Sequence, residues 1–292
     1  MNRYAHYHQA TAPSLRRDLT LDRVGVWQGA APALHRAMRA LTPEDIARFG
    51  EDPTARFKAN LDAVEARISA ACRRAGRPRA EVRLLPITKT VPVPVLERAI
   101  LAGVTTLGEN RVQELEQKHA ALHAPGLRWC LVGHLQGNKV KQAVRIADEF
   151  HALDSLRLAA RLDAALEALG RELDVTIQVN TSGEQTKFGI APSEVMAFAD
   201  ALGAYPRLRP RGLMTLAMLS ADLAEVRPCF ERLRALRDQV IRQHPSLTEL
   251  SMGMSGDFEA AIEEGATIVR VGQALFGARP TRDSDYWPGL AP

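Results

Sequence analysis

Short apolar runs alternate with longer amphipathic stretches through most of the chain, from residue 82 to residue 271. The runs have the length and apolar content of buried strands, and the stretches between them repeat apolar residues at helical spacing. Strands that alternate with helices predict βαβ units and a parallel sheet. We expect strands at 82–88, 105–108, 129–132, 150–153, 175–179, 211–217, 249–253 and 267–271, and helices at 93–102, 111–122, 138–147, 156–169, 192–203, 222–243 and 257–264.

The number of strands distinguishes between two architectures. Eight βα units within about 200 residues predict a single closed (β/α)8 TIM barrel, and the alternative is an open doubly wound sheet. In such barrels the active site lies at the carboxyl ends of the strands, and phosphate commonly binds to the loops after strands 7 and 8. The functional residues are therefore expected in the segments that follow each apolar run.

The first fifty residues lack this alternation. One segment, LTPEDIARFG, predicts a short helix with Thr42 as its N-cap and Pro43 at its first position. An extra helix begins after Asp52 and ends at Gly76-Arg77-Pro78. We assign residues 1–50 to an N-terminal extension, whose order and role the sequence leaves open, and residues 51–292 to the barrel domain. The apolar residues of the extra helix recur at helical spacing, namely Phe57, Leu61, Val64, Ile68 and Ala71.

The composition of the chain argues against nucleic acids and membranes as binding partners. The net charge is +4, but the basic residues are spread along the chain and form no run of the kind that marks a nucleic-acid site. No apolar run approaches the roughly 18 to 20 residues that a membrane span requires. The cysteines, Cys72, Cys130 and Cys229, are far apart and lack metal-ligand spacing, which favours a reducing compartment. We expect a cytoplasmic protein that binds neither nucleic acid nor a membrane.

The first predicted strand ends on a single lysine. In VRLLPITKTVPVP, residues 82–94, an apolar run leads to Lys89 between two threonines. Lysine is rarely buried unless something pairs with it. At the carboxyl end of a barrel strand the amine is either a charge shown to solvent or a nucleophile.

Two later loops have the features of an anion site. In MGMSGDFEAAIEEG, Ser255 and Gly256 stand where a helix starts, and free backbone N–H groups and the helix dipole favour an anion there. In VRVGQALFG, Gly272 allows a ligand to approach the backbone N–H of Gln273 closely. These loops follow strands 7 and 8, which neighbour strand 1 in a closed barrel. A phosphate site beside the amine of Lys89 indicates pyridoxal 5′-phosphate (PLP), whose aldehyde forms a Schiff base with lysine.

Arg270 precedes Gly272 by two residues, so it shares that side of the strand and points into the barrel near its mouth. There it would face the pyridine nitrogen of PLP, and its permanent charge would disfavour protonation of that nitrogen. The alternative is an ion pair within the barrel, with Glu109 as the partner. Three further polar residues follow strands, and for each of them alone capping of the next helix or turn is the simpler role: Asn110, Asn180 and Asp154.

Together these segments resemble the PLP homeostasis proteins, a family whose barrel is similar to the N-terminal domain of alanine racemase. The resemblance implies that Lys89 carries PLP as a Schiff base and that Arg270 faces the ring nitrogen. It also implies that Asn110, His134 and Met214 line the ring, and that Ser255, Gly272 and Gln273 hold the phosphate. The motifs that carry it lie in order between about residues 52 and 280: ITKT, GENRVQE, GHLQGNK, VNTSGEQTKFG, RGLMTL, LSMGMSGDFEAAIEEG and VRVGQALFG.

The chain departs from the family pattern in three places. Gln273 stands where the family usually has Thr or Ser, so only its backbone N–H is expected at the phosphate. Gly137 replaces a usual Ser, which is a minor change. The first fifty residues have no counterpart in the family pattern. Lys187, in a loop of the family motifs, is a candidate transient acceptor of PLP, with a solvated loop lysine as the simpler interpretation.

The resemblance implies a non-catalytic protein of intracellular PLP homeostasis, with apo PLP-dependent enzymes as candidate recipients of the cofactor. The alternative is an amino-acid racemase of the alanine racemase type. Racemisation needs two bases on opposite faces of the substrate, and a lysine is only one of them. A barrel that binds another phosphate compound is a third hypothesis.

The racemase hypothesis lacks a second base in the sequence. The chain ends about 15 residues after the last barrel motif, so the β-domain of alanine racemase and its dimer contacts are not expected. We therefore expect a monomeric carrier of PLP that is not an enzyme. The tyrosines all lie outside the strand-end motifs: Tyr4, Tyr7, Tyr205 and Tyr286.

Overall fold

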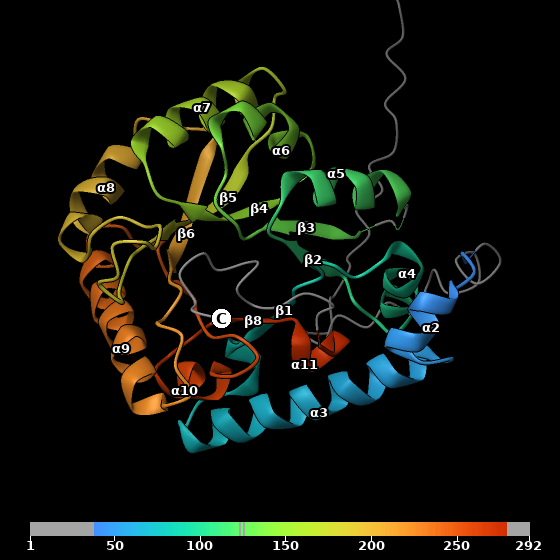
Figure 1. The fold of residues 1–292 in the computed structure, drawn as a ribbon. Coiled ribbons are helices and arrows are strands. Elements are labelled where there is room, and N and C mark those ends of the chain that lie inside the picture. The colour runs from blue at the N-terminus through green and yellow to red at the C-terminus, as the bar shows by residue number, and fades with distance from the viewer. Residues whose placement is uncertain (1–37, 123, 125, 279–292) are drawn as a thin grey trace, which may run out of the picture.

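The computed structural model describes residues 38–122, 124 and 126–278. Eight parallel strands form one barrel, and helices surround it (Figure 1), which confirms the predicted architecture. Within the described residues, no helix is both long and apolar enough to cross a membrane. The strands are β1 (Arg83–Pro86), β2 (Thr106–Glu109), β3 (Arg128–Leu131), β4 (Glu149–Leu153), β5 (Leu173–Gln178), β6 (Leu208–Met214), β7 (Glu249–Ser251) and β8 (Ile268–Val271).

The strand order brings the first and last strands together. β1 pairs with β8, with Leu85 opposite Arg270, and the order continues through β7 to β2. A bridge between Ile87 and Gly108 joins β1 to β2 just beyond the end of β1. The carboxyl ends of β1 and β8 are therefore neighbours, which is the arrangement that a lysine and a phosphate loop on these two strands require.

The helices form the outer layer of the barrel (Figure 1). Each has one apolar face, and those faces bury against the strands. A second, smaller apolar cluster fills part of the barrel interior and contains Leu85, Ile87, Cys130 and Ile268. The helices that follow the strands are α4 (Val93–Leu101), α5 (Val112–Ala121), α6 (Val140–Ile146), α7 (Leu156–Glu167), α8 (Val195–Leu202), α9 (Leu223–Val240), α10 (Phe258–Glu263) and α11 (Gln273–Phe276).

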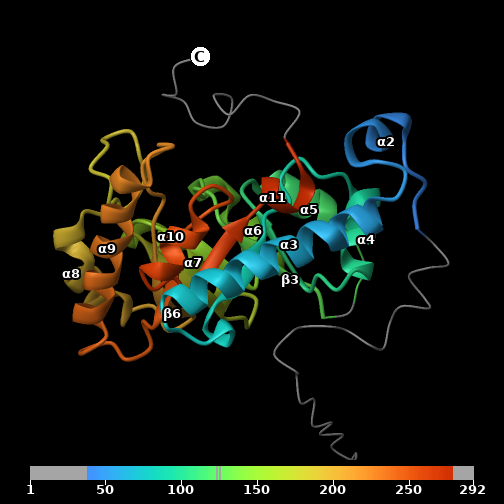
Figure 2. The same ribbon diagram turned by 90° about the horizontal axis from the view of Figure 1, so that it is seen from below.

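Two helices precede the barrel, as the sequence predicts (Figure 2). In α2 (Pro43–Phe49), Thr42 and Asp45 cap each other's backbone N–H groups at 3.1 and 2.9 Å. The long helix α3 (Pro53–Arg74) lies along α4, α10 and α11. Its Phe57 ring packs 5.1 Å from that of Phe276, so α3 supports the segment that follows β8.

The sixth strand differs from its prediction. The sequence predicts 211–217, and the structure places β6 at Leu208–Met214. The sequence does not indicate the beginning of this strand, because the polar residues Arg209 and Arg211, with Pro210 between them, interrupt the apolar pattern. Just beyond the end of the strand, the Thr215 N–H still bonds to the Ser251 carbonyl, while the Thr215 carbonyl accepts from Arg270.

Candidate functional site

Lys89 lies in a turn two residues beyond the bridge that joins β1 to β2, and it is partly buried. The residue before it is fixed by three contacts. The Thr88 N–H donates to the carbonyl of Gly108 at 2.9 Å, the Thr88 hydroxyl donates to the Glu109 carboxylate, and the Lys118 amine donates to the Thr88 carbonyl at 2.8 Å. The turn that carries Lys89 therefore starts from a rigid point at the mouth of the barrel.

A buried ion pair supports this turn from below. The Lys118 amine lies 2.6 Å from Oε1 of Glu109, whose side chain is fully buried. Burial raises the pKa of Glu109, and the contacts with Lys118 and Thr88 limit the rise. Glu109 is thus engaged by Lys118, so the alternative pairing of Arg270 with Glu109 is wrong.

Arg270 enters the barrel from β8, as its position two residues before Gly272 predicts. Its Nη1 donates to the Ser251 hydroxyl and its Nη2 donates to the Thr215 carbonyl, both at 2.9 Å. Burial lowers the pKa of Arg270 to about 10, although Asp257 acts in the opposite direction, so the guanidinium is charged at neutral pH. Both of these hydrogen bonds go to neutral acceptors, so the positive charge remains inside the barrel near the mouth.

The loops after β7 and β8 meet at Ser255. The Ser255 hydroxyl oxygen accepts from the backbone N–H groups of Gly272 and Ala274, at 3.3 Å each. Gly253 permits this approach because its φ is +90° and a Cβ there would lie 2.6 Å from the Cβ of Ala261. The result is a small cluster of backbone donors beside the carboxyl end of β1, since the Ile87 N–H is bonded to the carbonyl of Val271.

Gly133, the residue before His134, packs against the backbone of Asn110. A Cβ on Gly133 would lie 2.2 Å from the Asn110 carbonyl oxygen, so only glycine lets the loop after β3 pack this closely. The side-chain oxygen of Asn110 is buried and has no hydrogen-bond partner. A buried hydrogen-bond acceptor without a donor lowers the stability of the fold. A ligand that donates a hydrogen bond to this oxygen, or that causes the amide to rotate toward another donor, would satisfy it.

His134 stacks on Phe188, a contact that the sequence analysis missed. The ring centroids are 4.0 Å apart and nearly parallel, and Nδ1 of His134 lies 3.2 Å from the Asp154 carboxylate. Phe188 is 54% exposed, and it belongs to the TKFG motif that follows β5. The signal available in the sequence was a single aromatic residue within an otherwise polar loop motif.

The remaining predicted residues differ in their access to the mouth. Met214 is in register with Ser251 and so faces the barrel interior, but its side chain is fully buried. Gln273 begins α11 and is exposed. The amine of Lys187 donates to the Ala217 carbonyl at 2.9 Å and pairs with Glu184. Among these, Gln273 therefore offers its backbone N–H, and Lys187 is already engaged by the loops that follow β5 and β6.

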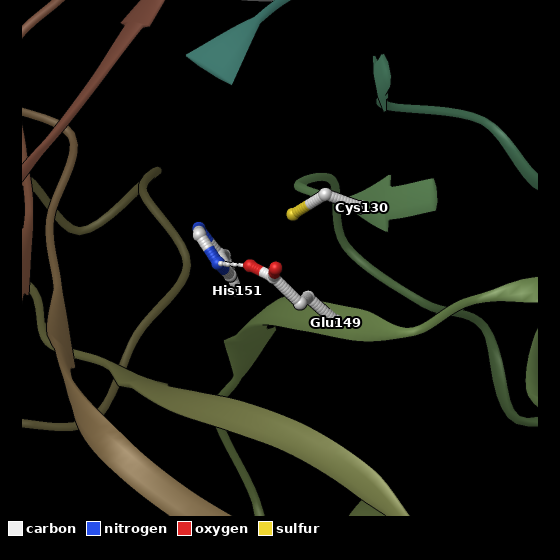
Figure 3. A group of neighbouring side chains, drawn as sticks. All are labelled: Cys130, Glu149 and His151. Atoms are coloured by element: carbon white, nitrogen blue, oxygen red, sulfur yellow. Dashed lines mark hydrogen bonds and ion pairs between the residues drawn. The ribbon is translucent and has the colours of Figure 1, made fainter. Parts of the chain in front are cut away.

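A second group of side chains lies toward the other end of the barrel (Figure 3). The ligand atoms of Cys130, Glu149 and His151 are within 4.8 Å of one another, which the sequence spacing did not reveal. Both oxygens of Glu149 accept from Arg83, and Glu149 also contacts Nε2 of His151 at 3.1 Å. Burial raises the pKa of the Cys130 thiol well above its usual value, which disfavours a thiolate ligand. Arg83, Glu149 and His151 thus form a hydrogen-bonded network beside the Cys130 thiol.

The network opens onto a cavity of about 310 Å³ at the amino ends of the strands. Acidic residues and arginines lie side by side in its lining, among them Arg83, Glu149, Asp174, Arg211 and Glu249. Ion pairs join several of these groups, with Arg83 and Arg128 on Glu149 and Arg211 on Asp174. The cavity is therefore best described as the polar base of the barrel.

The residues at the carboxyl end fit PLP. The Ser255 region gathers backbone N–H groups for a phosphate, and Arg270 supplies a buried positive charge. The unpartnered oxygen of Asn110 and the lysine turn lie at the same end. When bound, PLP would supply a reactive aldehyde to the amine of Lys89.

Comparison with known proteins finds relatives over most of the chain. The profile of the alanine racemase N-terminal domain matches residues 59–280. The chain is 42% identical over 220 residues to the pyridoxal phosphate homeostasis protein of Aquifex aeolicus, covering 75% of this chain and 96% of that protein. It is 37% identical to PipY of Synechococcus elongatus, solved with PLP bound, with a TM-score of 0.67 over 76% of this chain and 100% of that one.

The likeness extends to an alanine racemase of Clostridium difficile, with a TM-score of 0.63 and 14% identity. The match covers 78% of this chain and 58% of the racemase chain. At this identity the similarity shows a shared fold alone.

Proposed function

Since the chain belongs to the pyridoxal phosphate homeostasis proteins, within the alanine racemase N-terminal domain family, we propose that it binds PLP reversibly and serves PLP homeostasis. Lys89 forms the Schiff base: its amine adds to the aldehyde, a C=N bond forms and water leaves. Ser255 and the backbone N–H groups of Gly272 and Gln273 hold the phosphate. Arg270 faces the ring nitrogen, and Asn110, His134 and Met214 line the ring.

One observation carries this proposal. The turn of Lys89 and the Ser255 cluster lie on the adjacent ends of β1 and β8, with the buried charge of Arg270 on β8 below them. An amine, an anion site and a positive charge facing the ring are the three features that bind the aldehyde, the phosphate and the nitrogen of PLP. The structure of PipY with PLP bound supports the same ligand for a relative of this chain.

The role is that of a carrier and not of a racemase. A racemase requires a second base opposite the lysine. Within the described part of the chain the one tyrosine is Tyr205, which packs against the core just before β6, at the opposite end of the barrel from Lys89. The relatives named as homeostasis proteins support this role, whereas the racemase likeness concerns the fold.

The carrier acts in the cytoplasm as a monomer and passes PLP to apo PLP-dependent enzymes. Free thiols at Cys72, Cys130 and Cys229, all buried, are consistent with a reducing compartment. Release to another protein needs an accessible Schiff base, and Lys89 is only partly buried.

The test is an absorption titration of the purified protein with PLP, followed by assays of amino-acid racemase and transaminase activity. We expect a visible Schiff-base band that Lys89→Ala removes, and no turnover at ordinary enzymatic rates. The absence of the band in the wild-type protein would favour a barrel for another phosphate compound. Turnover comparable to that of an enzyme would favour the racemase hypothesis.

A further inference from the structure

The described part of the N-terminal extension is attached to the barrel at specific points. The backbone N–H of Arg39 donates to the Glu97 carboxylate at 2.8 Å, and the Arg39 guanidinium pairs with the same group. Arg98 returns a hydrogen bond to the Arg39 carbonyl at 3.2 Å. Residues 38–50 therefore lie beside α4 (Figure 1). Arg48 in this segment also contacts Thr90, in the turn that carries Lys89.

The residue after Lys89 has an unusual backbone. Thr90 has a φ of +63°, and it is the one non-glycine residue with a positive φ in the described ranges. The left-handed region is sterically unfavourable for a β-branched residue, and such strain persists only where surrounding contacts impose it. The conformation of Thr90 determines the direction in which the chain leaves Lys89.

Two charged groups hold Thr90 from opposite sides. The Arg48 guanidinium, at the end of α2, donates to the Thr90 carbonyl at 2.7 Å and to its hydroxyl at 3.3 Å. The Glu114 carboxylate, on α5, accepts from the Thr90 N–H at 3.0 Å and is itself paired with Lys118. Hydrogen bonds to charged groups are stronger than those between neutral groups. Both the N–H and the carbonyl of Thr90 form a hydrogen bond with a charged side chain.

We propose that Arg48 is a positioning residue of the PLP site, which makes the N-terminal extension part of that site. It holds Thr90 in the left-handed conformation and thereby fixes the turn from which Lys89 reaches the aldehyde. Glu114 belongs to the barrel that the family profile covers, whereas Arg48 lies outside the matched residues 59–280. The clamp, formed by Arg48 on Thr90, therefore reaches the site from outside the part of the chain that the family profile covers. The inference rests on the proposed role of Lys89.

The test compares Arg48→Ala and Arg48→Lys with Arg39→Ala. Lysine keeps the charge but has no planar fork for two acceptors. Arg39→Ala is the matched control because it removes another arginine that fastens the extension, one that does not contact Thr90. Two quantities are measured: hydrogen–deuterium exchange of the peptide containing residues 87–91 in the PLP-free protein, and the dissociation constant for PLP.

We expect Arg48→Ala to speed exchange in that peptide and to raise the dissociation constant at least about tenfold, the effect of one charged hydrogen bond. Arg48→Lys should fall between wild type and Arg48→Ala, and Arg39→Ala should resemble wild type in both quantities. Equal exchange and affinity in Arg48→Ala and wild type would overturn the inference, as would an equal effect of Arg39→Ala. If the wild-type protein binds no PLP, the proposed function fails, and the exchange measurement still tests the clamp alone.

Discussion

Arg270 donates a 2.9 Å hydrogen bond to the hydroxyl of Ser251, and that hydroxyl lies 3.0 Å from Nδ1 of His151 on the opposite side of the barrel. Nε2 of His151 contacts a carboxylate of Glu149, which only accepts, so Nε2 carries the proton and Nδ1 accepts from Ser251. Burial lowers the pKa of His151, which keeps the ring neutral. The charge expected at the PLP ring is thus held by a network that runs to the base of the barrel.

Removal of the Ser251 hydroxyl should loosen Arg270. We expect Ser251→Ala to raise the dissociation constant for PLP at least about tenfold, because one hydrogen bond to a charged group is lost. The spectral pH titration of the bound ring should also shift toward the protonated form. Ser246→Ala, at an exposed loop position, is the control and should leave both unchanged. An unchanged titration in Ser251→Ala would argue that Arg270 does not act through Ser251.

A negative charge at the anion site should exclude phosphate selectively. Ser255→Asp places a carboxylate where two backbone N–H groups converge, and we expect it to weaken PLP binding at least about tenfold, or about 1.4 kcal/mol. Pyridoxal, which lacks the phosphate, provides the internal control and should lose little affinity. Equal losses for the two ligands would place the phosphate elsewhere.

The buried pair below Lys89 should be important for stability. Lys118→Met leaves the Glu109 carboxylate buried without its partner, and we expect a loss of about 3–5 kcal/mol in the free energy of unfolding. The double variant Lys118→Met/Glu109→Gln should recover part of that loss because it removes the uncompensated charge. Urea denaturation measures both. A single variant as stable as wild type would show that the pair contributes nothing.

The base of the barrel should determine part of the acid stability. Burial acts to raise the pKa of Glu149, but hydrogen bonds from His151 and Arg83 outweigh it and hold the pKa well below the usual 4.5. A depressed pKa in the folded state adds stability that is present above pH 4.5 and is lost as the pH falls below it.

Glu149→Gln should therefore lower the free energy of unfolding at pH 7 by about 1–3 kcal/mol. It should also flatten the decline of that free energy between about pH 5 and pH 3. Glu167→Gln, at an exposed position on α7, is the control. The same acid decline in Glu149→Gln as in wild type would exclude this carboxyl as its source.

The sequence predicted the parts of the site that depend on strand ends. Lys89, Ser255 and Gly272 follow from a count of strands, and the inward direction of Arg270 follows from the two-residue repeat of a strand. Contacts between distant segments were not accessible in this way. The stack of His134 on Phe188 and the Cys130–Glu149–His151 group each join different strands or loops, and their distances depend on the closed barrel.

In the N-terminal extension, too, the sequence predicted local structure but not contacts with distant segments. Its helix was predicted because Thr42 and Pro43 are local signals. The clamp of Arg48 on Thr90 was not, since no sequence pattern indicates a threonine with positive φ.

The central claim is that Lys89 holds PLP, and borohydride reduction tests it most directly. The protein is incubated with PLP, reduced, digested and analysed by mass spectrometry for a pyridoxyl-lysine. We predict the pyridoxyl group on the peptide that contains Lys89, and its loss in Lys89→Ala. A label confined to Lys187, Lys139 or another lysine would contradict the assignment.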